Sequence, residues 1–160
     1  MTVTHADLPA PEALVPHKPP MLLLDEVLSF DEASITTRSH ITEANPFYVP
    51  GRGVPSYVAF EIMAQSISAH DGATRWQTGE PPAIGLLLGC RKFTVTRDWL
   101  QPGETVETEA SPLLFEGELR SFDCVVRSVS NEALATGAIN VFRPDDPDAF
   151  AANLAGPHAS

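Results

Sequence analysis

One segment constrains the fold of this chain more than any other. Residues 57–70 run without glycine or proline and form the only convincing long helix in the sequence. Apolar residues cover nearly all sides of this segment, which is typical of a buried helix. Ser56 is a good N-cap, and Asp71-Gly72 predicts the end of the helix. On this otherwise apolar helix, Glu61 and Gln65 lie one turn apart on the same side.

Strand candidates lie on both sides of this helix. Residues 34–41 are β-branched and alternate, and residues 21–30 begin as an apolar run and become strand-like. Residues 73–83 are polar and contain proline, which predicts a loop. Four strand candidates follow this loop: 84–95, 105–114, 119–128 and 133–142. The order predicts an α+β fold in which an antiparallel sheet wraps around one long central helix.

Proline marks the two ends of the chain. Of the 15 prolines, eight lie within 20 residues of one end or the other. We therefore expect an irregular N-terminal arm over residues 1–13, one domain over 14–143 and a Pro/Asp/Ala-rich tail over 144–160. Three further prolines and two glycines fall within residues 45–55, which predicts a loop immediately before the helix.

Charge and composition exclude several classes of function. Ten basic residues against 21 acidic ones give a net charge of −11, which argues against a nucleic acid or an anionic membrane as a partner. No apolar run is long enough to span a membrane, and no signal peptide is visible. Cys90 and Cys124 are typical of reduced, buried residues in a cytoplasmic protein. The five histidines show no metal-ligand spacing, so no metal site is expected.

Several short motifs resemble those of the hot-dog fold β-hydroxyacyl-[acyl carrier protein] dehydratases, in the same order along the chain. Residues 14–25 (LVPHKPPMLLLD) resemble the opening motif of that family. Pro55-Ser56 followed by residues 61–65 (EIMAQ) resembles the start of the central helix, which carries the catalytic acid. Residues 89–93 (GCRKF) and 101–104 (QPGE) resemble the strand and turn that follow. The resemblance covers most of the chain and implies a hot-dog fold.

The C-terminal half is similar to the divergent dehydratase subunit found with aryl polyene biosynthesis. The segments that carry this likeness are 85–89, 113–114, 117–124 and 134–137. The likeness implies a 3-hydroxyacyl-[acyl carrier protein] dehydratase-type subunit. It also implies a substrate carried on phosphopantetheine, with no other cofactor.

The loop before the helix departs from the dehydratase pattern. There the loop has the form Pro-Phe-Phe-x-Gly-His-Phe-Pro-Gly, and its histidine is the catalytic base. Residues 46–48 match the beginning of that pattern and Pro55 matches its end, but the loop between them is shorter. Counting from the two ends places Gly51 or Phe47 where the histidine belongs, so the base of the family is missing here.

Glu61 is the candidate acid. Dehydration of a 3-hydroxyacyl thioester needs a base for the proton beside the carbonyl and an acid for the departing hydroxyl. Desolvation on an apolar helix favours the protonated form of a carboxyl group, although a Glu paired with a neighbouring Arg is the structural alternative. Gln65 is either an orienting hydrogen-bond partner of Glu61 or an ordinary satisfied amide.

The start of the helix supplies candidate substrate-binding residues. Free backbone N–H groups at Ser56 and Tyr57 can hold the thioester oxygen as it gains negative charge. Tyr57 and Phe60 are candidates for the lining of an acyl tunnel, with core packing as the alternative.

One local basic patch stands out from the acidic chain: Arg91, Lys92 and Arg97. Because acyl carrier proteins are acidic, such a patch beside the tunnel is a candidate docking surface for the carrier, with a solvated strand face as the alternative.

The missing loop histidine leaves three functions open. In the first, the chain is a dehydratase-type subunit: Glu61 faces a histidine of a partner subunit, or the chain dehydrates alone with another residue or a water as the base. Whether the partner in the dimer is a copy of this chain (a homodimer) or a His-bearing relative (a heterodimer with a second hot-dog dehydratase) stays open. In the second, the chain is a hot-dog acyl thioesterase in which Glu61 activates water, and in the third it is a non-catalytic binding subunit. His17 and His40 are expected to be structural, and His70 lies about 13 Å along the helix from Glu61, too far to act with it.

Overall fold

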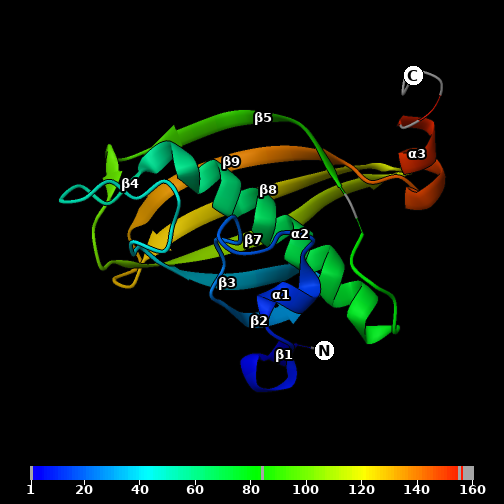
Figure 1. Ribbon diagram of the computed structural model, residues 1–160, viewed down its shortest axis with the longest axis horizontal. Coiled ribbons are helices and arrows are strands. Elements are labelled where there is room, and N and C mark those ends of the chain that lie inside the picture. The colour runs from blue at the N-terminus through cyan, green and yellow to red at the C-terminus, as the bar shows by residue number, and fades with distance from the viewer. Residues whose placement is uncertain (1, 84, 155, 157–160) are drawn as a thin grey trace.

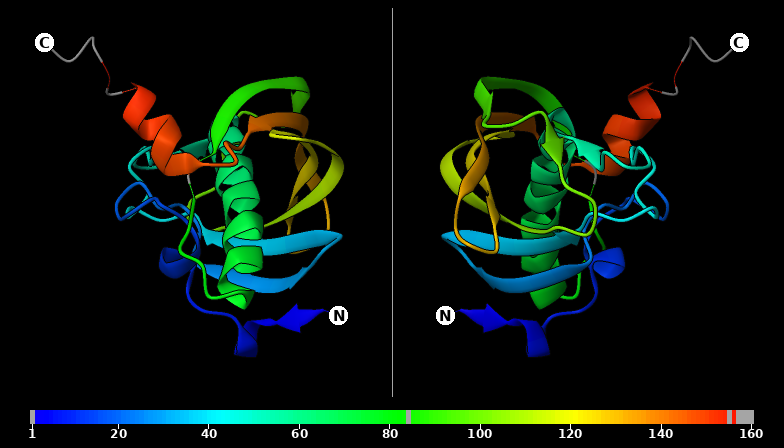
Figure 2. Two further views of the ribbon diagram at one scale, coloured as in Figure 1. Left: turned by 90° about the vertical axis from the view of Figure 1, so that its right-hand side faces the viewer. Right: turned by 90° about the vertical axis from the view of Figure 1, so that its left-hand side faces the viewer.

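A long central helix, α2 (Ala59–Gln77), lies inside a strongly curved antiparallel sheet of seven strands (Figures 1 and 2). The structure is a computed structural model that describes residues 2–83, 85–154 and 156. The strand order is β1-β2-β3-β7-β8-β9-β5. Their bounds are Val3–Thr4 (β1), Glu26–Asp31 (β2), Ser34–His40 (β3), Leu86–Val95 (β5), Thr105–Glu116 (β7), Leu119–Ser128 (β8) and Ala133–Phe142 (β9). The predicted α+β architecture is confirmed.

The core forms where the concave face of the sheet meets α2. Strands β7 and β8 bury every second side chain along much of their length, including Val106, Ala110, Phe122 and Val126, as expected of strands with one face on the core. The helix contributes side chains from several sides, among them Ile62, and its buried positions run from Ala59 to Ala73.

The helix differs from its prediction at both ends. It begins with a 3₁₀ turn, η2 (Ser56–Val58), in which the Ser56 hydroxyl makes no capping hydrogen bond. It continues through Gly72, the predicted stop, as far as Gln77, so the first part of the predicted loop is helical. A Cβ on Gly72 would lie 1.8 Å from the carbonyl oxygen of Leu14. Gly72 therefore allows close packing of the preceding chain rather than ending the helix.

The loop before the helix is held by a small second sheet that sequence analysis missed. Strand β4 (Val54–Pro55) pairs with β6 (Trp99–Leu100). Gly53 has φ +99°, and a Cβ there would lie 2.0 Å from the carbonyl oxygen of Leu100. Only glycine fits this turn, which closes the short loop against β6.

The two ends of the chain carry more regular structure than expected. The N-terminal arm contains β1, the 3₁₀ turn η1 (His5–Asp7) and the short helix α1 (Pro11–Leu14). The tail contains α3 (Pro147–Leu154), whose Phe150 ring lies 5.7 Å from that of Phe142. The description of residues 1–13 as an irregular arm and the domain boundaries stay predictions, although the arm contains these short regular segments. No helix in the described part of the chain is long and apolar enough to span a membrane.

Candidate active site

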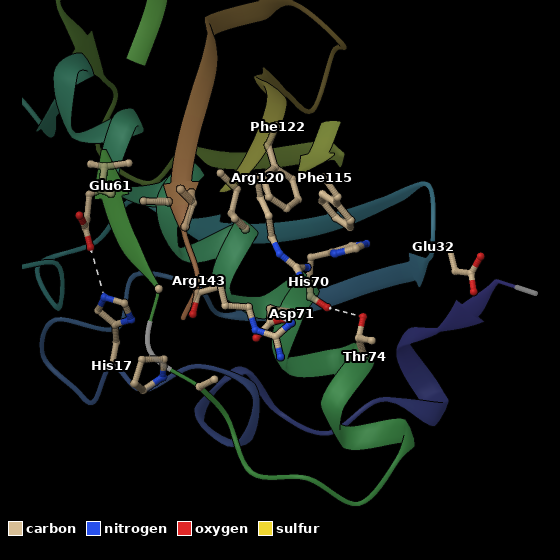
Figure 3. A pocket seen from close by; sticks show the side chains of 18 residues that line it. His17, Glu32, Glu61, His70, Asp71, Thr74, Phe115, Arg120, Phe122 and Arg143 are labelled. Carbon is tan, nitrogen blue, oxygen red and sulfur yellow. Dashed lines mark hydrogen bonds and ion pairs between the residues drawn. The ribbon is translucent and has the colours of Figure 1, made fainter. Parts of the chain in front are cut away.

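A cavity of about 540 Å³ runs along α2 between the helix and the inner face of the sheet (Figure 3). Glu61 and His17 line it near the start of the helix. Beside a later part of α2, the lining of the cavity includes Arg120 of β8 and Arg143, which follows β9. The side of α2 that faces this cavity carries polar residues of the otherwise apolar helix, among them Glu61 and Asp71.

Glu61 points into the cavity and is held through one of its oxygens. Its Oε1 accepts a hydrogen bond of 3.0 Å from Gln65 Nε2 and lies 3.5 Å from His17 Nε2. The side chain is about one-third exposed (34%), so it faces the cavity and is not sealed in the core. Because both neighbours approach Oε1, the other oxygen has no hydrogen-bond partner among the described residues.

Gln65 is fully buried and uses every hydrogen-bonding group of its amide. Its Oε1 accepts the N–H of Leu23 at 2.7 Å, and its Nε2 donates to the carbonyl of Met21 at 2.8 Å and to Glu61. The two backbone groups leave the amide only one orientation, so Gln65 always offers an N–H to Glu61. The predicted contact between Glu61 and Gln65 is present in the structure, together with backbone contacts that sequence analysis did not foresee.

His17 lies closer to the candidate acid than expected. It belongs to the opening PHKPP motif, and the two backbone bonds of Gln65 hold residues just after this motif against the helix. Its Nδ1 is buried without a hydrogen-bond partner in the part of the chain that the structure describes. The signal for this contact in the sequence was the PHKPP motif, which directly precedes the segment that Gln65 binds.

A second polar cluster lines the cavity further along the helix. Arg143 Nη1 forms an ion pair of 3.1 Å with Asp71 Oδ1, and the Arg120 guanidinium lies 4.4 Å from the centre of the Phe115 ring. Burial, and the nearby charge of Arg143, lower the pKa of Arg120. Burial also lowers the pKa of His70, whose Nε2 lies 3.0 Å from the carbonyl oxygen of Asp31. Sequence analysis missed this cluster. Its signal in the sequence was Arg120, a charged residue at a position where the alternation of the strand predicts an apolar one.

The model of the ApeP-like family, described as the ApeP dehydratase, matches residues 9–152. The chain belongs to the ApeP-like dehydratase family. The chain is therefore a dehydratase or a subunit of one, and the resemblance drawn from its motifs is confirmed.

Relatives and solved structures agree with this assignment. The chain is 33% identical over 129 residues to a 3-hydroxyacyl-[acyl-carrier-protein] dehydratase, FabZ of Thermus thermophilus, covering 78% of this chain and 83% of the relative. Its fold matches the dehydratase heterocomplex ApeI:P from Xenorhabdus doucetiae with a TM-score of 0.81 and 23% identity, covering 90% of this chain and 97% of that one. A hypothetical thioesterase protein from Streptococcus pneumoniae, solved with coenzyme A, matches with a TM-score of 0.60 and 6% identity, covering 74% of this chain and 84% of that one. These structural matches confirm the hot-dog fold.

Three predicted substrate-binding residues of this ApeP-like chain lie away from the cavity lining. Ser56 is buried, and the Tyr57 side chain is 68% exposed. Phe60 packs edge-on against Phe93, with ring centres 5.7 Å apart. The cavity does not include them among its lining residues in the described part of the chain, so their role in substrate binding stays a prediction.

The predicted docking patch does not act as one group of free charges. Arg97 forms an ion pair with Glu104, which also accepts the backbone N–H of Gln101. Arg91 and Lys92 are exposed on β5, and Lys92 adopts φ +56° at an irregularity of the strand. Their side chains remain available for a carrier protein, while the charge of Arg97 is already compensated.

No three His, Cys, Asp or Glu side chains gather as metal ligands would in the described ranges. Cys124 is buried, which raises its pKa to about 12, and burial also raises the pKa of the half-buried Cys90. Both thiols are therefore poor nucleophiles.

Proposed function

We propose that this chain is the acid-bearing subunit of a 3-hydroxyacyl-[acyl carrier protein] dehydratase, and that a second hot-dog chain supplies the base. The observation that carries the proposal is the carboxyl group of Glu61, held by the fully satisfied amide of Gln65 and facing a cavity. The dehydratase family of the chain supports the reaction class.

The geometry suits protonation of a leaving hydroxyl group. Gln65 donates to Glu61 Oε1, which keeps that oxygen as an acceptor and leaves Oε2 to carry the acidic proton. In the reaction, Oε2 passes this proton to the departing hydroxyl, which leaves as water. The base takes the proton from the carbon beside the thioester carbonyl, and a carbon–carbon double bond forms. Only the acid half of this pair is assigned to the chain.

Among the described histidines, His17 lies beside the acid, whereas His40 and His70 make contacts elsewhere. His17 Nε2 faces the oxygen that Gln65 already holds, so its contact orients Glu61. His70 Nε2 is engaged with a backbone carbonyl, and His40 Nδ1 lies 3.0 Å from a threonine hydroxyl. A base from a partner subunit satisfies this requirement. A dehydratase of the same fold, ApeI:P, is a heterocomplex, which supports a partner of this kind.

Strand β5 offers an edge on which a partner can be placed. It is the last strand of the seven-stranded sheet and exposes Leu86, Leu87 and Leu88. An exposed apolar edge strand is a template for pairing with another chain. We therefore place the dimer contact, with a copy of this chain or with a second dehydratase, along β5.

An acyl carrier protein is the proposed source of the substrate. The FabZ relative is named for acyl carrier protein substrates, and the exposed Arg91 and Lys92 provide positive charge for an acidic carrier. The phosphopantetheine arm of the carrier then delivers the thioester, and the chain itself needs no further cofactor. A cytoplasmic location remains part of this proposal.

The test compares the dehydration activity of the purified complex before and after substitution of Glu61. Glu61→Gln removes the transferable proton and keeps an oxygen that can accept from Gln65, so we expect dehydration of 3-hydroxyacyl-carrier substrate to fall at least about 100-fold. Mass spectrometry of the carrier measures the loss of water. The matched control is Glu109→Gln, on the exposed side of β7, which should keep full turnover.

Each of the other functions has its own outcome in this assay. Full activity of Glu61→Gln in the complex would make this chain a non-catalytic binding subunit. Release of free thiol from acyl thioesters by the pure protein, lost in Glu61→Gln, would make it a thioesterase. Measurement of the native mass completes the test, because a protein that dehydrates as a homodimer refutes the need for a second kind of chain.

A further inference from the structure

We propose that Arg120 and Arg143 form an oxyanion subsite of the cavity, about 15 Å along the helix from Glu61, which holds a carboxylate or phosphate group of the thioester substrate. The nature of the substrate rests on the proposed function. The subsite itself rests on the placement of the two guanidinium groups.

Arg120 occupies a position that the strand pattern reserves for the core. Along β8, Phe122, Cys124 and Val126 face inward and are buried, and Arg120 continues the same alternation. A cation on the inner face of a sheet is costly unless it is paired or functional. The guanidinium packs on the Phe115 ring, and its Nε is buried without a hydrogen-bond partner in the described residues.

A comparison with the other arginines shows what is unusual about Arg120. In the part of the chain that the structure describes, four arginines have a buried Nε without a partner: Arg38, Arg97, Arg120 and Arg143. Each of the other three forms an ion pair with a carboxylate through its terminal nitrogens. Arg120 forms none with the described residues, although it lines a cavity that a ligand can enter. The missing partner of Arg120 is therefore an anion from outside the described chain.

Arg143 adds a second positive charge at the same place. In the sheet Arg120 lies opposite Val141, and Arg143 directly follows the end of that neighbouring strand, two residues beyond Val141. Asp71 forms its ion pair with Arg143, so within the described residues Arg120 is the guanidinium group of this cluster that contacts no carboxylate. Burial and the nearby charge of Arg143 lower the pKa of Arg120, while the charges of Asp71 and Asp145 act against this lowering from a distance. An anion bound beside Arg120 would supply the direct contact that these two carboxylates do not make.

The distance between this positive charge and Glu61 sets the length of a ligand that reaches both. Asp71, which holds Arg143, is ten residues after Glu61 on one continuous helix, and this corresponds to about 15 Å. The wall of the same cavity includes the apolar side chains of Leu87 and Val141. A thioester placed at Glu61 can therefore extend an apolar chain past these residues. The oxyanion is either a carboxylate at the far end of the acyl chain or the phosphate of the pantetheine arm.

Binding to the full-length protein, purified with its partner chain where it has one, tests the proposal. The probes are acyl thioesters of pantetheine and of phosphopantetheine, each made with a methyl end and with a carboxylate end, in a series of lengths that includes about 15 Å. Arg120→Met removes the cation and keeps an apolar stem. The matched control is Arg127→Met on the same strand, whose side chain is not part of the cavity lining in the described residues.

We expect Arg120→Met to weaken the probe that carries the recognised oxyanion by about 10- to 100-fold, the effect of losing a charge-assisted hydrogen bond. Its binding of the probe without that group should be unchanged, and Arg127→Met should bind all probes normally. An effect confined to carboxylate-ended chains identifies the acyl end as the ligand, and one confined to phosphopantetheine identifies the arm. Equal binding of all probes by the parent protein and Arg120→Met would overturn the proposal.

Measurements of thermal stability and of complex formation show whether Arg120→Met still folds and assembles. Because Arg120 lacks a carboxylate partner in the described residues, Arg120→Met should keep or raise the thermal midpoint. Loss of the complex in Arg120→Met would show that Arg120 pairs with a partner chain and would also overturn the subsite. The measurements need no turnover, so they can be repeated in the Glu61→Gln protein. Failure of the subsite would leave the test of the acid unaffected.

Discussion

Replacement of Gln65 by methionine tests the central arrangement of the site. The side chain is fully buried and makes three hydrogen bonds, to Leu23, Met21 and Glu61. Methionine has a similar size and helix propensity, so the substitution removes the amide without creating a large cavity. The substitution removes the hydrogen-bond partner of two backbone groups and the donor that orients the acid.

The expected cost follows from these contacts. The buried N–H of Leu23 loses its acceptor, which costs about 1–3 kcal/mol, and each of the other two bonds contributes about 1 kcal/mol net. The free energy of unfolding should therefore fall by about 4 kcal/mol. For a chain of this size, that corresponds to a decrease of about 8–16 °C in the thermal midpoint. Dehydration by the folded protein should fall about tenfold, because Glu61 loses the donor that orients it.

Denaturation with urea and calorimetry measure the stability, and the carrier-based dehydration assay measures the activity below the new midpoint. The control is Gln77→Met, the same substitution at the exposed last residue of α2, which should change stability by less than about 0.5 kcal/mol. If Gln65→Met cost no more than Gln77→Met, the amide would not be what ties the opening motif to the helix. If stability fell but activity per folded molecule did not, Gln65 would be structural and not an orienting residue.

Two further predictions concern the packing and titration of α2. Gly72→Ala places a methyl group against the Leu14 carbonyl and should lower the free energy of unfolding by about 2 kcal/mol in urea denaturation, whereas Gly89→Ala, with open space around it, should have little effect. Burial lowers the pKa of His70, so the unfolded chain takes up the proton first. Stability should therefore be constant above about pH 6.5 and fall below it, with a slope of at most about 1.4 kcal/mol per pH unit that His70→Phe removes. Equal loss for both alanine variants, or an unchanged pH curve in His70→Phe, would contradict these assignments.

The sequence was informative wherever one periodicity governed a whole element. The strands β8 and β9 have the predicted bounds, and the central helix was recognised because its apolar residues cover nearly all sides. The contact between Glu61 and Gln65 was one of the two alternatives that the sequence left open for Gln65, and the structure contains it together with the backbone bonds of a satisfied amide.

The errors arose where distant contacts decide the local structure. Gly72 resembles a helix stop, but its reason is the approach of Leu14, a residue far away in the chain. Ser56 resembles an N-cap, yet the helix enters through a 3₁₀ turn and the hydroxyl makes no cap. The pairing of β4 with β6 joins two-residue segments, which are too short to give any periodic signal.

The two ends of the cavity wall share one property that links fold to function. Glu61 is a carboxyl group on an apolar helix, and Arg120 is a cation on the inner face of a strand. Each violates the pattern of its own element, and both line the same cavity. The rest of the sequence agrees with the fold at the level of periodicity and packing. Residues that break this agreement are expected at functional sites, where a less stable side chain is kept for its chemistry. This reasoning supports the proposals that the chain carries the acid and an anion subsite, and that a partner chain supplies the base that the loop of residues 45–55, closed by Gly53 against β6, lacks.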